Sequence, residues 1–191
     1  MFLQDTPVAE GEHAQDHRFL RAALLYFRRK YRDLDWRVGW AAPIAGGTVF
    51  LMWLGLDLLM GTTSESVSGA GLASLSTPAR VTWIVFRTLA ATVTVPIAEE
   101  LAFRGFLLRR LISPNFEKVN CRSFTLFSVF GSSIAFGILH GDHWLAGTIA
   151  GVFYAFTFRN RGRMGDAVVA HAITNALLIP WVLHSGNWRF W

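Results

Sequence analysis

The chain has 191 residues, of which 52% are hydrophobic and only 16% are charged. Soluble domains carry about 25% charged residues, so this deficit and the mean hydropathy of +0.35 argue against a disordered chain. The single cysteine excludes an intramolecular disulfide scaffold. Lysine and arginine outnumber aspartate and glutamate by 18 to 13, but they lie between apolar stretches, so a nucleic-acid partner has no support beyond the charge. The composition favours a polytopic membrane protein.

The first 37 residues are more polar than the rest of the chain. We expect residues 1–37 to be a cytoplasmic or interfacial extension and residues 38–191 to be the membrane-embedded domain. Residues 17–32 mix apolar and basic positions, which is typical of an amphipathic helix facing anionic lipid headgroups. An ordinary helix packed on a neighbour is the alternative. No signal peptide is expected, because the first 18 residues are polar and acidic.

Five apolar stretches follow, and they predict an all-α transmembrane bundle of about five spans. They cover residues 38–60, 80–111, 124–140, 144–158 and 165–183. The second stretch exceeds the ~20 residues that cross a ~30 Å hydrocarbon layer. We therefore expect it to be long or bent, with a bend at Pro96, which lacks a backbone donor. Gly147 and Gly151 form a GxxxG pattern that predicts close packing of the fourth helix.

The distribution of basic residues predicts the orientation in the membrane. The N-terminal segment and residues 104–122 and 159–163 are rich in arginine or lysine, whereas residues 61–79 and 141–143 have none. Loops rich in lysine and arginine stay in the cytoplasm. The N-terminus is therefore predicted to be cytoplasmic and the C-terminus to lie outside.

Ionisable side chains in membrane helices are costly and mark function by default. Glu100 and Arg104 are four residues apart, so in a helix they can pair. Glu99 points about 100° away from Glu100 and has no cation three or four residues on. We therefore predict that Glu99 is a general base and that Glu100 is the structural partner of Arg104. The alternative is that both glutamates anchor a helix end.

A second polar pair, His171 and Asn175, is also four residues apart. An imidazole and an amide on one helix face are two donors that can bind an oxyanion, although a lone helical histidine is more often a core residue. His140 ends the third apolar stretch and, taken alone, is interpreted as interfacial. Asp57 and Arg87 are interpreted as snorkelling or structurally paired charges without a chemical role.

Three motifs in this order, on three apolar stretches, resemble the CAAX-protease and bacteriocin-processing family. The motifs are Glu99-Glu100-x-x-x-Arg104-Gly105, Phe136-x-x-x-His140 and His171-x-x-x-Asn175. The resemblance covers residues 80–180 and implies a glutamate-type intramembrane endopeptidase. Residues 39–57 are similar to the bacterial subgroup associated with exosortase sorting systems, which implies a bacterial cytoplasmic membrane.

The resemblance also implies a role for each motif residue. Glu99 would activate a water, and His140 would help to bind it. His171 and Asn175 would stabilise the oxyanion, while Glu100 and Arg104 would hold the helix, with Glu100 able to share the proton. The implied partners are the lipid bilayer and a protein or peptide substrate, lipidated or membrane-anchored, and neither a cofactor nor a metal is implied.

Three other interpretations stay open. Two histidines and a glutamate can bind zinc with an open fourth position, which would make the protein a zinc-dependent intramembrane protease. A non-catalytic immunity or scaffold protein would keep the same fold. A small transporter with a buried proton relay is compatible with intramembrane glutamate and histidine, but no internal repeat supports it.

One feature of the sequence conflicts with a single site. Counting ~1.5 Å per residue from the basic helix ends, Glu99 lies ~15 Å deep and His171 ~12 Å deep, but His140 lies ~27 Å deep. The three residues meet only if the third helix starts late, with residues 122–127 at the interface and a soft point at 131–133. Otherwise either the topology or the site is wrong.

Overall fold

A computed structural model describes residues 33–60 and 71–188. The amphipathic helix predicted for residues 17–32 lies outside the described residues, as does most of the loop predicted for 61–77. The described helices belong to one compact unit, residues 35–191; the separate extension at residues 1–37 stays a prediction. The described part of the chain is all-α, as predicted, and contains no strand beyond an isolated bridge between Asp35 and Arg163.

Residues 33–60 and 71–188 contain seven α-helical segments, two π-helical segments and two short 3-10 turns. They are α2 (Ala41–Met60), α4 (Thr77–Leu89), η1 (Ala90–Thr94), α5 (Val95–Glu100), η2 (Leu101–Leu107), α6 (Leu108–Arg110), η3 (Phe116–Lys118), α7 (Leu126–Ile138), η4 (Gly141–His143), α8 (Trp144–Arg161) and α9 (Met164–Ser185).

Each of the five predicted apolar stretches is helical. Within the described residues, three helical segments are long and apolar enough to cross a membrane, namely Ala41–Leu59, Thr77–Arg110 and Met164–Ser185. Helix α7 has 13 residues and is therefore ~20 Å long, shorter than the ~30 Å hydrocarbon layer. The helical membrane bundle is confirmed, while five complete crossings stay a prediction.

The second predicted stretch is a single helical segment of 34 residues, Thr77–Arg110. Two π-helical segments, η1 and η2, stand on either side of α5. Pro96 has no N–H to bond to the carbonyl of Thr92 one turn earlier, and the widened turn η1 lies directly before it. The chain thus passes Pro96 with a widened turn in place of a break. Widened turns of this kind are frequent at functional sites.

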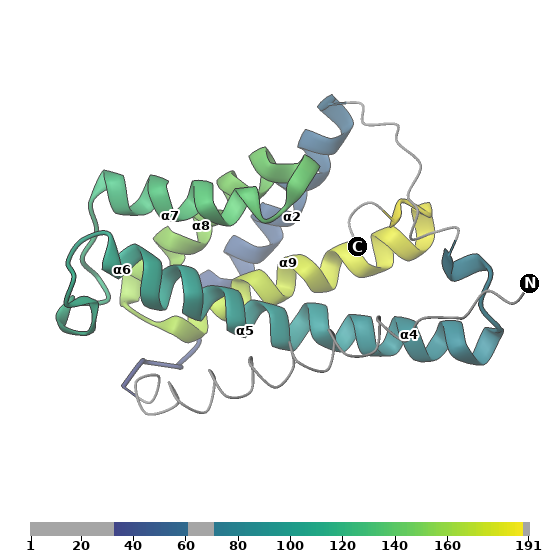
Figure 1. Ribbon diagram of the computed structural model, residues 1–191, viewed down its shortest axis with the longest axis horizontal. Helices are drawn as coiled ribbons and strands as arrows, with labels where there is room; N and C mark the ends of the chain where they lie inside the picture. Colours follow the sequence, from purple (N-terminus) through teal and green to yellow (C-terminus); the bar gives the residue numbers. More distant parts are fainter. Residues whose placement is uncertain (1–32, 61–70, 189–191) are drawn as a thin grey trace, which may run out of the picture. The chain divides into compact units, whose positions relative to one another are not determined.

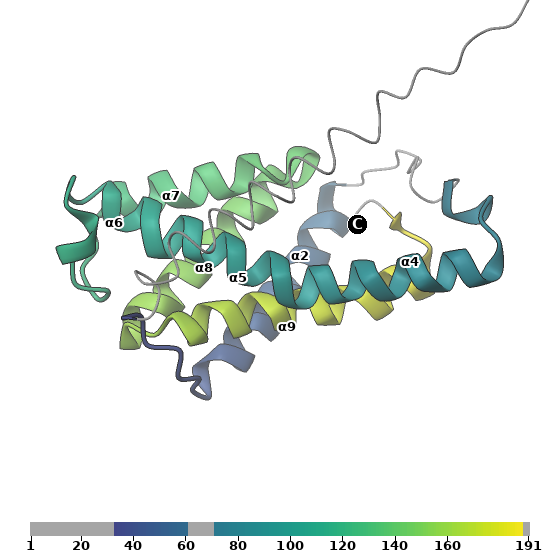
Figure 2. The ribbon, with the colours of Figure 1, turned by 60° about the horizontal axis from the view of Figure 1, so that its bottom comes forward.

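Helices α8 and α9 are central to the packing, because they contact each other and both contact α2. Helix α7 lies along α8, and α2 packs against both α8 and α9 (Figure 1). The long Thr77–Arg110 segment runs beside α9 through η1 and α5, and Figures 1 and 2 show this pairing from two directions. The C-terminal half of the Thr77–Arg110 segment also contacts α7. Helices α7 and α9, which with the long segment position the predicted site residues, therefore both contact the Thr77–Arg110 segment.

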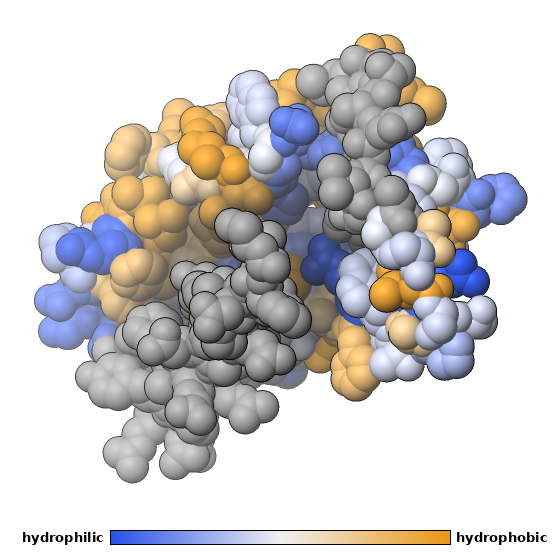
Figure 3. Space-filling model, turned by 45° about the vertical axis from the view of Figure 1, so that its right-hand side comes forward, coloured by the Kyte–Doolittle hydropathy of each residue, from blue (hydrophilic) through white to orange (hydrophobic). Residues whose placement is uncertain are grey.

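Many large apolar side chains stay on the outside of the bundle. Leu58, Leu59 and Phe86 are 76%, 84% and 69% exposed, and Figure 3 shows apolar side chains in orange gathered mainly on the upper left of one face. Water-soluble proteins rarely expose apolar patches of this extent. The exposed apolar surface fits contact with lipid hydrocarbon, in agreement with a membrane protein.

The GxxxG pattern packs closely against α7, as predicted. A Cβ atom on Gly151 would lie 3.0 Å from the Cα atom of Ser133, and one on Gly147 would lie 2.9 Å from Nδ1 of His140. On the facing helix, a Cβ atom on Gly137 would contact the side chain of Thr148 and lie 2.7 Å from its backbone nitrogen. Glycine on both helices thus lets α7 and α8 approach and places His140 near the bundle interior.

This close packing makes a testable prediction. Gly137→Ala should lower the thermal unfolding temperature of the purified protein, because overpacking a tight contact costs about 1–3 kcal/mol. The matched control is Gly47→Ala in α2, where an added Cβ meets nothing within 4 Å and alanine favours the helix by about 1 kcal/mol. A Gly137→Ala protein that unfolds at or above the temperature of Gly47→Ala would show that the two helices are not in such close contact.

Candidate active site

Four of the six predicted site residues line one cavity of about 280 Å³. Glu99, His140, His171 and Asn175 reach it from three different parts of the chain. Glu100 and Arg104 do not line the cavity; they lie behind its wall, 0% and 1% exposed. The three motifs therefore meet in space, and the two glutamates occupy different environments.

Glu100 and Arg104 form a buried ion pair. Nη1 of Arg104 donates to Oε1 of Glu100 at 3.1 Å, and Nε lies 3.1 Å from Oε2. Nη2 of Arg104 donates to the carbonyl oxygen of Gly151 in α8 at 2.8 Å. The predicted pairing is confirmed, and it also ties the Thr77–Arg110 segment to the helix that packs on α7.

Glu100 has a second partner, His171, that the sequence did not indicate. Nδ1 of His171 lies 3.1 Å from Oε1 of Glu100. Since a carboxylate paired with arginine only accepts hydrogen bonds, we assign the ring proton to Nδ1. The other ring nitrogen, Nε2, is then directed to the cavity side, 3.9 Å from Oε2 of Glu99. Glu100 therefore orients His171 as well as pairing with Arg104.

Two aromatic rings fix the plane of the His171 imidazole. Tyr154 stacks on it at 4.9 Å between ring centroids and 15° between planes, and Phe136 meets it edge-on at 5.7 Å. The Tyr154 hydroxyl donates to Oγ1 of Thr174 at 2.8 Å. The sequence analysis did not single out Tyr154; the available signal was a tyrosine three residues after Gly151 within an apolar stretch.

Asn175 lies one turn after His171 and is already hydrogen-bonded. Its Nδ2 donates to the carbonyl oxygen of Ala91 at 2.8 Å, within the π-helical segment η1. An amide nitrogen has two N–H groups, so one remains for another acceptor. The contact joins α9 to the widened turn before Pro96 and fixes the direction of the amide.

His140 lies in the turn directly after α7, next to Phe136. Its Nδ1 lies 2.9 Å from the Phe136 carbonyl oxygen; because a carbonyl only accepts, Nδ1 carries the proton and Nε2 is left with a lone pair. The ring centroids of His140 and Phe136 are 4.7 Å apart. Phe136 thus packs against both His140 and His171.

The depth conflict seen in the sequence is reduced by where α7 begins. The helix starts at Leu126, and Thr125 caps it by accepting a hydrogen bond from the Ser128 amide. From Leu126 the rise to His140 is ~21 Å rather than ~27 Å. The late start is therefore confirmed, but the soft point predicted at residues 131–133 is wrong, because α7 is continuous there.

Glu99 is the half-buried carboxylate of the cavity, and its side chain is 25% exposed. Its Oε2 atom is buried and has no hydrogen-bond partner among the described residues. A buried carboxylate oxygen of this kind needs a donor. The cavity is therefore lined by a carboxylate oxygen that can accept a hydrogen bond and by the imidazole rings of His140 and His171.

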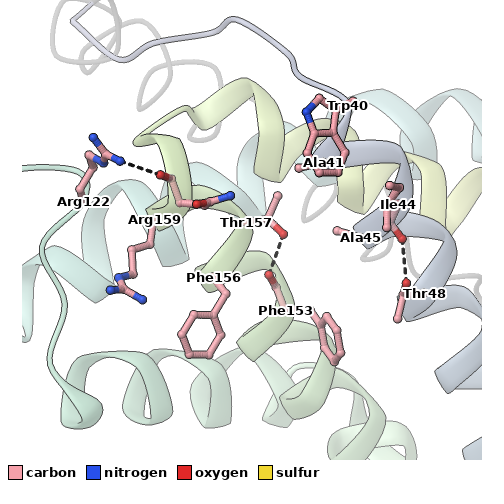
Figure 4. Close-up of a pocket in the computed structure, with 11 residues that line it drawn as sticks. Trp40, Ala41, Ile44, Ala45, Thr48, Arg122, Phe153, Phe156, Thr157 and Arg159 are labelled. Carbon is pink, nitrogen blue, oxygen red and sulfur yellow. Dashed lines mark hydrogen bonds between the residues drawn. The ribbon is translucent and has the colours of Figure 1, made fainter.

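A second cavity, of about 560 Å³, lies between α2 and α8 and carries different chemistry (Figure 4). Its two threonine hydroxyls bond to carbonyl oxygens one turn earlier in their own helices. None of its lining residues is a carboxylate or an imidazole. The smaller cavity is therefore the candidate active site.

Over the described residues, no group of three His, Cys, Asp or Glu side chains is arranged to hold a metal ion.

Comparison with known proteins identifies the class to which this fold and this cavity belong. Residues 81–177, half of the chain, match the family of type II CAAX prenyl endopeptidase Rce1-like proteins. The chain therefore belongs to the type II CAAX prenyl endopeptidase Rce1-like family, which makes it a protease-type membrane hydrolase acting on a protein or peptide. Neither a curated protein nor a solved structure matches the chain. The family resemblance is confirmed; the exosortase-associated subgroup stays a prediction.

The different surroundings of the two glutamates make a testable prediction. Glu100→Gln should lower the free energy of unfolding by about 3–5 kcal/mol, because it leaves Arg104 buried without its counter-charge. Glu99→Gln removes a half-buried charge without an arginine partner and should leave stability unchanged or slightly raised. Denaturant unfolding in detergent measures both, and equal losses in the two variants would contradict the assignment.

Proposed function

We propose that this protein is a glutamate-type intramembrane endopeptidase in which Glu99 is the general base. The observation that carries the proposal is Oε2 of Glu99, which is buried without a hydrogen bond among the described residues and lies 3.9 Å from Nε2 of His171 in a cavity inside an apolar bundle. The family supports peptide-bond hydrolysis. The geometry supports a division of labour in which Glu99 acts on water and Glu100 positions His171.

In the first step Glu99 accepts a proton from a water molecule in the cavity. The water oxygen attacks the carbonyl carbon of the peptide bond, so that a C–O bond forms as the proton moves to the carboxylate. Nε2 of His140 accepts a hydrogen bond from the other O–H of the water, which stays bonded to its oxygen, and so orients the water, because Nδ1 of His140 is already bonded to Phe136. General-base catalysis of this kind contributes about 10²–10⁴ to a rate.

His171 and Asn175 stabilise the oxyanion that this attack creates. Asn175 offers the N–H that Ala91 does not use. His171 offers Nε2–H in its doubly protonated form. Oxyanion donors in water-excluded sites contribute about 10²–10³.

Collapse of the intermediate completes the reaction. The oxyanion re-forms the C=O bond and Glu99 returns the proton to the peptide nitrogen as the C–N bond breaks, which releases an amine and a carboxylic acid; in water these ionise to an ammonium and a carboxylate. Glu99 is then ready for the next water. No group other than water is consumed, and every proton that Glu99 removes is returned to the leaving nitrogen.

We place this reaction in a multi-pass protein of a bacterial cytoplasmic membrane. Residues 38–191 form the catalytic domain and residues 1–37 an interfacial extension. The substrate is a membrane-associated protein or peptide, lipidated or membrane-anchored. The reason is that the cavity lies within a helical bundle whose outer surface is apolar.

A comparison of protein termini tests the proposal directly. Host membranes carrying the wild type should contain new protein termini that are absent from membranes carrying Glu99→Gln at equal expression. The control is Glu117→Gln, the same change at an exposed residue outside the cavity, which should behave as the wild type. Mass spectrometry of labelled termini would identify the substrate and the cut site.

The outcome also separates the other interpretations. Identical termini in the wild type and Glu99→Gln, with both proteins folded, would contradict the protease and favour the scaffold or immunity function. Cleavage that depends on Glu99 but is lost with a chelator and restored by zinc would replace the glutamate mechanism with the zinc-dependent one.

A further inference from the structure

The cavity follows one stripe of the long Thr77–Arg110 segment. Arg87, Ala91, Val95 and Glu99 all line it, and they are spaced four residues apart. Residues at this spacing lie on the same face of a helix. A rise of ~1.5 Å per residue places the backbone of Arg87 ~18 Å from that of Glu99. The sequence interpretation gave Arg87 no chemical role, but the structure places it on the same cavity wall as Glu99.

The cavity extends from Glu99 in one direction only. On α9 its lining runs from His171 to Leu178, toward the C-terminal end of the helix. In the opposite direction the walls are closed, because Phe103, Arg104 and Gly105 are buried, as are the first residues of α9. Helix α4, which carries Arg87, has no buried residue. Arg87 therefore lies at the open end of the cavity.

Arg87 has an exposed side chain, and no carboxylate in the described part of the chain forms an ion pair with it. The other formally charged residue that lines the cavity is Glu99, about three helical turns away. A cation at the edge of an apolar bundle is stabilised by an anion. The planar guanidinium binds a carboxylate through two parallel hydrogen bonds, so a carboxylate is the chemistry that this position fits.

We infer that Arg87 binds a carboxylate of the substrate and so fixes how far along the peptide Glu99 cuts. This inference rests on the proposed function, because it takes Glu99 as the cutting end. An extended peptide advances ~3.3 Å per residue, so the ~18 Å interval corresponds to about five residues, and fewer once the reach of both side chains is counted. The C-terminal carboxylate of a short tail and an acidic side chain share this chemistry.

Peptide binding to the full-length protein in detergent tests the inference without requiring cleavage. The probe is a dansyl-labelled peptide of four apolar residues with a free C-terminal carboxylate, compared with the same peptide as a C-terminal amide. Measurements use the Glu99→Gln background, in which the peptide stays intact. Fluorescence anisotropy should show the acid binding at least ~10-fold more tightly than the amide, as expected for a charge-assisted hydrogen-bonded pair.

Matched arginine variants assign the preference to one residue. Arg87→Gln should abolish the difference between acid and amide, whereas Arg80→Gln, on the same helix but outside the cavity lining, should keep it. A third peptide, amidated but with one internal glutamate, identifies the source of the carboxylate. If it binds as tightly as the free acid, the anchor is an acidic side chain; if it binds as weakly as the amide, the anchor is the C-terminus.

Two results would overturn the inference. One is an acid-to-amide ratio in Arg87→Gln equal to that of the parent protein. The other is an absence of preference for the acid in the parent protein, including failure of both peptides to bind. Either result can occur while Glu99-dependent termini are still found, so failure of the Arg87 inference and failure of the protease proposal are distinguishable.

Discussion

Arg104 lies in the protein interior with its guanidinium shared between the carboxylate of Glu100 and the carbonyl oxygen of Gly151. Burying two charges is expensive, and a buried pair is often no more stabilising than apolar residues of the same size. In this protein the ion pair fixes the positions of the helices that it connects. Glu100 also contacts Nδ1 of His171, so one buried anion links the long helix, α8 and α9 and sets the direction in which the imidazole faces.

The same interaction explains why two adjacent glutamates can have different roles. Glu100 points inward, where Arg104 lies 3.1 Å from both of its oxygens and His171 contacts Oε1, while Oε2 of Glu99 faces the cavity 3.9 Å from His171 and accepts no hydrogen bond among the described residues. The widened helical turns on either side of α5 keep the Thr77–Arg110 segment continuous through Pro96. Glycine contacts between α7 and α8 bring His140 to the same cavity. A catalytic arrangement therefore depends on helix packing throughout the bundle rather than on one motif.

The sequence predicted the parts of this arrangement that follow from spacing along one helix. The Glu100–Arg104 pair and the close packing at Gly151 both follow from helical periodicity and side-chain size. Contacts between helices could not be predicted in the same way. Nothing in the spacing of the residues shows that Glu100 contacts His171 or that Asn175 donates a hydrogen bond to Ala91. The depth of His140 was misjudged because it depends on where Thr125 caps α7, and helix ends are poorly defined by apolar composition alone.

The protonation state of the two His171 ring nitrogens tests directly whether Glu100 orients this histidine. Solid-state ¹⁵N NMR of histidine-labelled protein in lipid, with the signal assigned by its loss in His171→Gln, reports each ring nitrogen separately. We expect Nδ1 of His171 to be protonated and hydrogen-bonded, and we expect Glu100→Gln to change its chemical shift while the signals of His140 stay in place. An unprotonated Nδ1, or a His171 signal indifferent to Glu100→Gln, would contradict the claim that Glu100 orients the catalytic histidine.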